Sequence, residues 1–208
     1  GTPVTEMPAF SHPAGTYFSA FDLEITCATP NAVIYYTTDG SEPDNTSTEY
    51  TAPINLSTNT TVKARAYAPG YQQSFVTEAT YEFEDVTQVA NIAELRAMSA
   101  KDDTYYEITG EVILTFQQDF RNQKYIQDAS AAILIDDDPG VITTSYDIGD
   151  GITGMIGSLT SYGNMLQFNP AVDPGPPSST GNEIIPEVIT LDEMVNNFEE
   201  YEAELVKI

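Results

Sequence analysis

Two loops of the sequence gather carboxylates at close spacing, and oxygen-rich loops of this kind suit a cation such as Ca²⁺. The first loop holds Asp39, Glu42 and Asp44, and the second is the run Asp136–Asp138. Neither has the spacing of an EF-hand. Successive side chains of an extended segment point apart, so only two of the three adjacent aspartates would converge on one ion. We therefore favour a structural turn in the first loop and a solvated turn in the second, and expect no metal and no other cofactor.

The residues that could act in catalysis are equally sparse. The single cysteine, Cys27, alternates with Leu23 and Ile25, which predicts a thiol on the buried face of a strand. A catalytic thiol needs an activator such as a nearby histidine, and the only histidine, His12, lies in the loop-like S-H-P-A-G. Glycoside hydrolysis needs two carboxyl groups that flank the scissile bond, but the sequence shows no aromatic-lined cleft and contains no Trp. We expect no catalytic residues and a protein that is not an enzyme.

The charge balance limits the partners. Acidic residues number 32 against 7 Lys and Arg, a formal net charge of −25. Nucleic-acid affinity is built on cationic contacts that release counterions, so we expect no nucleic-acid partner. No apolar run is long enough to span a membrane. The many Tyr, Thr, Asn and Ser residues are typical of an extracellular or cell-surface protein, whose signal peptide and any lipid anchor would lie outside this sequence.

Residues 1–83 read as a run of short strands separated by turn clusters. Strands are expected at Phe21–Ala28, Ala32–Thr37, Ile54–Leu56, Thr61–Tyr67 and Phe75–Phe83. In the fourth of these, Val62, Ala64 and Ala66 should face inward. Six or seven short strands without a helical pattern predict an immunoglobulin-like β-sandwich.

Three segments of this domain carry a resemblance to a known family. I-Y-Y-T-T-D-G-S-E-P, Y-T-A-P-I and T-T-V-K-A-R-A-Y followed by P-G-Y resemble the C-terminal domain of chitobiase and β-hexosaminidase. The resemblance implies an immunoglobulin-like sandwich with an accessory role in exported bacterial proteins, and it supplies no catalytic residue. Five tyrosines could offer rings to a sugar, but their positions are more typical of core or cross-strand pairs. They are Tyr35, Tyr36, Tyr50, Tyr67 and Tyr71.

Residues 84–183 form a second predicted domain. Asn91 as N-cap and Glu94 at the third helical position predict a short helix. Tyr105–Phe116 is expected to be a long strand that bends at Gly110. Two hairpins are expected, Lys124–Gln127 with Ala132–Ile135 and Ile152–Thr160 with Met165–Phe168. Five strands, one of them bent, suit a small closed barrel of the OB type, so the whole chain is predicted to be all-β.

The order of I-T-G-E-V, Y-I-Q-D-A-S-A-A-I-L-I-D and Y-G-N-M-L-Q-F resembles OB-fold-like domains of unknown function in secreted Bacteroidetes proteins. OB barrels bind oligonucleotides or oligosaccharides on one face. A single-strand site combines basic residues with stacking aromatic ones. The candidate faces here carry an excess of acids: Asp119, Asp128, Asp136–Asp138, Asp147 and Asp150 against Arg121 and Lys124. This balance contradicts a nucleic-acid role but not the fold.

Residues 184–208 repeat part of this order. Thr190 and Glu193 form a capping box before an apolar run, and a Tyr-Glu pair and a strand follow. One interpretation is that the segment starts a second OB-like repeat, so that the natural protein continues. The other is that Tyr201–Ile208 completes the first barrel.

These features predict a non-catalytic binding or adhesion module for an unidentified glycan or protein. The alternative is an accessory region of a larger secreted hydrolase, a glycosidase or a nuclease, whose catalytic domain lies outside this chain. A third reading is a structural spacer.

Overall fold

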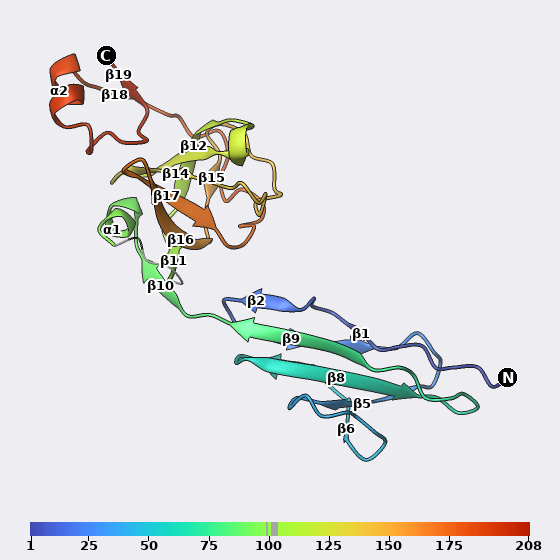
Figure 1. The fold of residues 1–208 in the computed structure, drawn as a ribbon. Helices are drawn as coiled ribbons and strands as arrows, with labels where there is room; N and C mark the ends of the chain where they lie inside the picture. Colours follow the sequence, from blue (N-terminus) through green and yellow to red (C-terminus); the bar gives the residue numbers. More distant parts are fainter. Residues whose placement is uncertain (99, 101–103) are drawn as a thin grey trace. The chain divides into compact units, whose positions relative to one another are not determined.

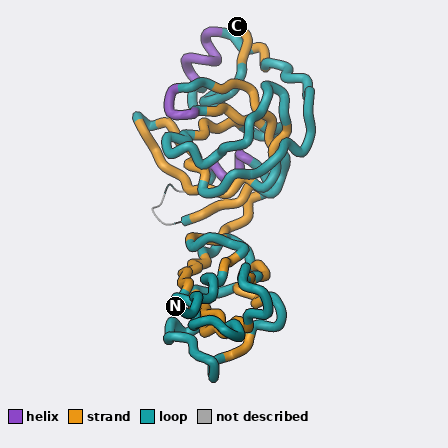
Figure 2. Tube along the Cα trace, turned by 90° about the vertical axis from the view of Figure 1, so that its right-hand side faces the viewer, coloured by secondary structure: helices purple, strands orange, loops and turns teal. Residues whose placement is uncertain are grey.

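The computed structural model describes residues 1–98, 100 and 104–208. The chain divides into two compact units, Gly1–Glu84 and Asp85–Ile208, which are described separately. Strands dominate both units (Figure 1), and the described helices all lie in the second unit (Figure 2). The predicted all-β class is confirmed.

The first unit is a β-sandwich. Its larger sheet has the order β2-β9-β8-β5-β6, and two short pairs, β1 with β4 and β3 with β7, form the other layer. The strands of the larger sheet are β2 (Gly15–Tyr17), β5 (Val33–Thr37), β6 (Thr48–Glu49), β8 (Thr60–Tyr67) and β9 (Thr77–Phe83). The short strands are β1 (Ala9–Phe10), β3 (Phe21–Leu23), β4 (Ile25–Thr26) and β7 (Ile54–Leu56).

The core of the sandwich follows the alternation of the sequence. Val62, Ala64 and Ala66 are fully buried on one face of β8, as predicted, because side chains of a strand alternate between the core and the other face. The predicted single strand from Phe21 is wrong in one respect. It is divided at Glu24, because its two halves pair with different strands, β7 and β1.

The second unit contains a barrel-like sheet with the order β10-β11-β16-β17-β14-β13-β12-β15 among the described residues. Its strands are β10 (Val86–Val89), β11 (Tyr105–Ile108), β12 (Val112–Gln117), β13 (Lys124–Gln127), β14 (Ala132–Ile135), β15 (Gly151–Ile152), β16 (Met155–Tyr162) and β17 (Met165–Pro170). β11 and β12 are the two halves of one bent strand: β11 pairs with β16, and β12 pairs with β13 at the other end of the sheet. When this bent strand is counted as the first and β13, β14, β16 and β17 as the second to fifth, the order is 1-2-3-5-4-1. The third and fifth strands, β14 and β17, are parallel. This is a closed arrangement of the OB type.

The bend at Gly110 is set by close backbone contact. The Gly110 amide donates to the Ala90 carbonyl at 3.2 Å, and a Cβ at this position would lie 2.6 Å from the same oxygen. Only glycine fits without a shift of the backbone.

We therefore expect Gly110→Ala to lower the free energy of unfolding of the second unit by roughly 1–2 kcal/mol, as overpacking does. Chemical denaturation monitored on this unit measures the change. Gly154→Ala serves as the control for an added methyl group, since a Cβ there meets no atom within 4 Å, although its positive φ carries its own strain. An unchanged free energy of unfolding for Gly110→Ala would contradict the contact argument.

Mostly aliphatic side chains fill the barrel together with the ring of Phe168, and the helix α1 (Ile92–Arg96) covers one part of it with Ile92 and Leu95, both fully buried. A single 3-10 turn, η1 (Phe120–Asn122), lies between β12 and β13. Asn91 accepts a hydrogen bond from the Glu94 amide, so the predicted N-cap is confirmed.

The C-terminal segment forms a separate two-stranded parallel sheet, β18 (Glu187–Val188) with β19 (Val206–Lys207), with α2 (Leu191–Asn196) between the strands. The suggestion that Tyr201–Ile208 completes the first barrel is wrong, because β19 pairs with β18 and not with β11. Among the described residues, no helix is long and apolar enough to cross a membrane.

Candidate functional site

The turn at Asp39 is held by its own side chain. The Asp39 carboxylate accepts hydrogen bonds from the Ser41 amide at 3.0 Å and the Ser41 hydroxyl at 2.6 Å. These bonds, led by that of the hydroxyl, lower the pKa of Asp39. Gly40 has a φ of 76°, a value that glycine adopts without strain. Asp39 therefore forms the turn that leaves β5.

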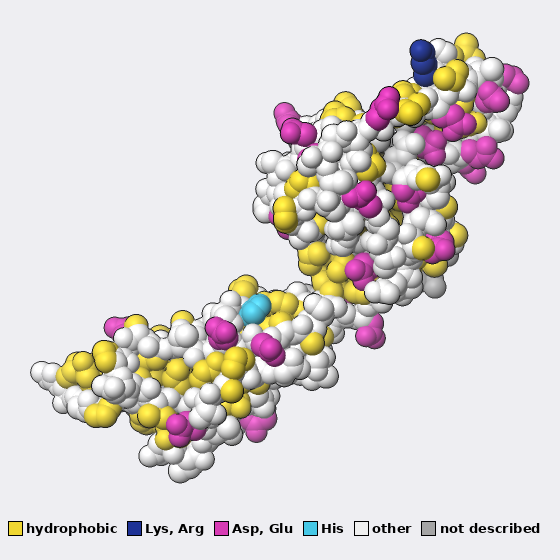
Figure 3. All heavy atoms as spheres, turned by 180° about the vertical axis from the view of Figure 1, so that it is seen from behind, with side chains coloured by type: hydrophobic (Ala, Val, Ile, Leu, Met, Phe, Trp, Pro, Cys, Tyr) yellow, Lys and Arg dark blue, Asp and Glu magenta, His cyan; other side chains and the backbone are white. Residues whose placement is uncertain are grey.

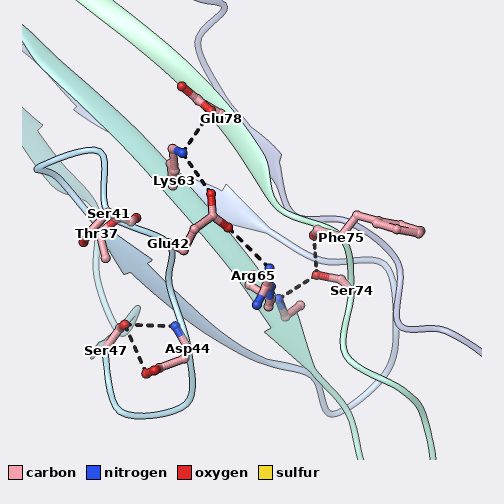
Figure 4. Close-up of polar contacts among 11 residues, drawn as sticks. Thr37, Ser41, Glu42, Asp44, Ser47, Lys63, Arg65, Ser74, Phe75 and Glu78 are labelled. Atoms are coloured by element: carbon pink, nitrogen blue, oxygen red, sulfur yellow. Dashed lines mark hydrogen bonds and ion pairs between the residues drawn. The ribbon is translucent and has the colours of Figure 1, made fainter.

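The other two acids of this loop point to different partners (Figure 4). Glu42 lies between Lys63, at 2.9 Å, and Arg65, at 3.5 Å, and Lys63 also contacts Glu78 at 3.3 Å. Asp44 accepts hydrogen bonds from residues 46 and 47 of its own loop. The three carboxylates thus serve three local contacts and do not converge on a common point. Among the described residues, no cluster of three potential ligands could hold a metal ion.

Two of the three aspartates at 136–138 are buried, which corrects the expectation of a solvated turn, while Asp138 is exposed in the turn that follows them. Asp136 and Asp137 are 5% and 0% exposed. The Asp137 carboxylate accepts the amides of Val141, at 2.7 Å, and Ile142, at 3.1 Å. Burial is tolerated because each carboxylate meets donors, which offsets the loss of water.

Arg121 supplies the donors for Asp136. Its Nε and Nη2 both bond this carboxylate, and its Nη1 lies 3.3 Å from Asp138. The hydrogen bond from Arg121 holds the pKa of Asp136 below its usual value, against the opposing effect of burial. The side-chain amide of Gln123 adds a longer contact to Asp136 at 3.4 Å. The guanidinium is therefore fully engaged by acids of the same chain.

A cavity of about 270 Å³ lies beside this pair. It is bounded by the loop from β12 to β13 and by the end of β16 where it turns into β17. Its lining residues are Phe120, Arg121, Gln123, Asp136, Tyr162 and Gln167. In an OB barrel, the loops between strands one and two and between strands four and five flank the ligand-binding face. The cavity lies between these two loops.

Two aromatic rings stand at the cavity with most of their surface in water. Phe120 is 68% exposed and Tyr162 is 80% exposed. Arg121 and Asn122 next to Phe120 have φ values of 52° and 48°. Non-glycine residues adopt this conformation at a cost of about 1–3 kcal/mol, and such residues cluster at ligand-binding sites. The Arg121–Asp136 pair offsets the strain and fixes the loop that presents Phe120.

Neither Phe120 nor Tyr162 was among the candidate site residues expected from the sequence. Arg121 was noted only as part of the charge balance, and Asp136 as part of that balance and of the acidic run 136–138. The available signal was an aromatic residue beside turn-forming residues in each loop, F-R-N and S-Y-G-N. Several of the other acids that were noted have structural roles: Asp128 accepts the Ile92 amide at 2.8 Å, and Asp150 accepts the Asp147 amide at 2.8 Å.

The tyrosines of the sandwich pack against each other as cross-strand pairs would. Tyr35 meets Tyr67 edge to face with ring centroids 5.6 Å apart, and Tyr36 meets Tyr50 at 6.4 Å. They do not form an open platform. Tyr71 is 42% exposed.

Cys27 is half-buried against the sandwich core, and its thiol donates to the Glu6 carbonyl at 3.3 Å. His12 instead contacts the Ser11 hydroxyl at 2.9 Å and stacks on Phe21. The structure thus assigns the two residues to different partners, neither of which activates the thiol.

The fold of the first unit is that of an immunoglobulin-like β-sandwich. Residues 12–78 match the family described as the chitobiase/β-hexosaminidase C-terminal domain, which is a non-catalytic accessory domain. The match lies within the sandwich unit, Gly1–Glu84, and does not reach the barrel. Comparisons with the curated proteins and with the solved structures gave no match.

Proposed function

We propose that this chain is a non-catalytic binding module of the cell exterior, and that its ligand is a glycan held at the cavity beside Phe120 and Tyr162. The exposure of these two rings at the OB-type ligand face carries the proposal. Aromatic faces stack on the apolar faces of sugar rings, while the Gln123 and Gln167 amides and the Asp136 carboxylate can bond hydroxyl groups.

The charges favour a neutral or amino sugar over an acidic one. The one cation of the cavity, Arg121, already pairs with Asp136 and Asp138. The net charge of the chain is −25, and acidic side chains are visible on both units (Figure 3). A phosphate, sulfate or uronate group would therefore meet repulsion without a free partner. The same argument disfavours single-stranded nucleic acid, which needs a basic groove beside its stacking rings.

The experiment is a glycan array followed by calorimetric titration of the strongest neutral hit. We expect Phe120→Ala and Tyr162→Ala each to weaken binding by about tenfold or more, since aromatic anchors commonly contribute above 1 kcal/mol. Phe75→Ala is the matched control, because Phe75 is 73% exposed but lies in the sandwich. An array without hits, or a loss of affinity in the control equal to that of the two variants, would contradict the proposal.

The second candidate function is an accessory region of a larger secreted glycosidase. The match of residues 12–78 to a domain of chitobiase and β-hexosaminidase favours it. In that case the glycan-binding site would keep an attached catalytic domain near its substrate. The test assays the full natural protein, with and without residues 1–208, on polymeric chitin and on short chitin fragments. The protein without residues 1–208 should lose activity on the polymer and keep it on the short fragments.

A further inference from the structure

The C-terminal segment has the same construction as the entry to the barrel. In both places a short strand leads into a capped helix and then into a second strand parallel to the first. These are β10-α1-β11 and β18-α2-β19. The Thr190 side chain caps α2 and Glu193 completes a capping box, which confirms the predicted helix start.

The two β-α-β segments have the same strand register. Val89 pairs with Ile108 in the first, and Val188 pairs with Lys207 in the second. Both members of the pair are shifted by 99 residues between the two β-α-β segments. The same shift of 99 relates the N-caps, Asn91 and Thr190, and the first helical residues after them. It also relates Glu94 to Glu193, each of which bonds back to the start of its helix. One shift that preserves strand pairing, cap and helix start together indicates an internal repeat.

The two β-α-β segments, β10-α1-β11 and β18-α2-β19, differ in what covers their apolar residues. In the first, Val89, Ile92 and Leu95 are at most 2% exposed and pack in the barrel core. Their counterparts Val188 and Leu191 are 75% and 64% exposed, and Met194, the counterpart of Leu95, is half-buried. Further apolar residues of the segment also reach the surface: Ile185 at 74%, Val195 at 76%, Phe198 at 54% and Ile208 at 62%. Hydrophobic side chains are visible there in Figure 3. Adjacent exposed apolar residues of this kind mark a surface that another element covers.

We infer that residues 184–208 are the first β-α-β unit of a second OB-like barrel, and that the strands of this barrel, which follow β19 in the natural polypeptide, cover the apolar face of α2. β19 would then be the first half of a bent strand, as β11 is in the first barrel. The proposal does not depend on the glycan site.

The contacts of Arg96 show how the repeat joins the first barrel. Its guanidinium donates to the Glu202 carboxylate at 2.8 Å, to the Glu199 carbonyl at 3.2 Å and to the Ala132 carbonyl at 3.0 Å. Glu202 has a side-chain exposure of 10%. The end of α1 thus links the first barrel to the segment that follows α2. Successive repeats that contact their neighbours in this way form linear arrays.

The test compares this 208-residue chain with a chain extended by about 100 residues, one repeat further, through amide hydrogen exchange. We expect peptides from 185–208 to exchange about 100-fold more slowly in the extended chain, as amides in a folded core do. Peptides from β11 should be equally protected in both chains. Leu191→Ala should leave the melting of the short chain unchanged and lower that of the extended chain.

Three results would overturn the inference. The first is equal exchange of 185–208 in both chains. The second is a natural sequence without a strand-rich repeat after β19. The third is a short chain that dimerises in sedimentation experiments and becomes monomeric on Val195→Asp, because a second copy would then be the occupant of the apolar face.

Discussion

Replacement of Phe168 by alanine is expected to unfold the second unit at a much lower temperature and to leave the first unit unchanged. Phe168 is fully buried in β17, and its ring lies against Gly157 of β16, where a Cβ would come within 2.7 Å of it. The neighbours cannot collapse easily into the space of the ring, because the barrel strands on both sides are fixed by pairing. The loss is about 3–5 kcal/mol, or roughly 10–20 °C in melting temperature.

Tyr81→Ala provides the reciprocal experiment. Tyr81 is fully buried in the sandwich core, and its hydroxyl donates to the His12 carbonyl at 3.0 Å. This variant should lower the melting of the first unit alone. Differential scanning calorimetry of the whole chain should resolve two transitions, each sensitive to one variant. A single transition that moves with both variants would contradict the division into Gly1–Glu84 and Asp85–Ile208.

The regular parts of both units could be predicted from the sequence because local rules determine them. The alternation of apolar residues located β8 and its buried face. Capping residues located both helices. Gly110 marked the bend because only glycine fits so close to the Ala90 carbonyl. In each case the decisive interaction lies within the element or beside it.

The candidate site could not be predicted, because residues distant in the sequence create it. Phe120 and Tyr162 come to one cavity only through the order in which β12, β13, β14, β17 and β16 pair. The burial of Asp136 depends on Arg121 in a loop whose backbone conformation is unusual. A run of three aspartates looks like a solvated turn when its cationic and amide donors are unknown.

Acid should selectively remove the contribution of Asp173 to stability. Its carboxylate accepts the amides of Thr143 and Thr144 at 2.9 Å, that of Gly175 at 3.0 Å, and the Thr143 hydroxyl. It thereby ties the loop before β15 to the segment after β17. Burial raises the pKa of Asp173, but the hydrogen bonds from the Thr143 hydroxyl, Gly175 and Thr144 outweigh it and hold the pKa far below its usual 3.8.

The sign of the pH effect follows from that depression. A carboxyl group with a lower pKa in the folded state stabilises the protein above its unfolded pKa, here near 3.8, and this contribution disappears as pH falls through the folded value. Asp173→Asn should therefore lower the free energy of unfolding by about 2–3 kcal/mol at pH 7. The difference from the unmodified protein should shrink steadily below pH 4.

Urea denaturation at a series of pH values measures this difference. Asp147→Asn is the matched control, because Asp147 is an exposed aspartate of the same barrel, and it should change the free energy of unfolding by less than about 0.5 kcal/mol. A difference for Asp173→Asn that stays constant down to pH 2 would mean that the amide and hydroxyl donors stabilise the protonated and ionised carboxyl group equally. The loop before β15 would then be held by hydrogen bonds that do not require the charge of Asp173.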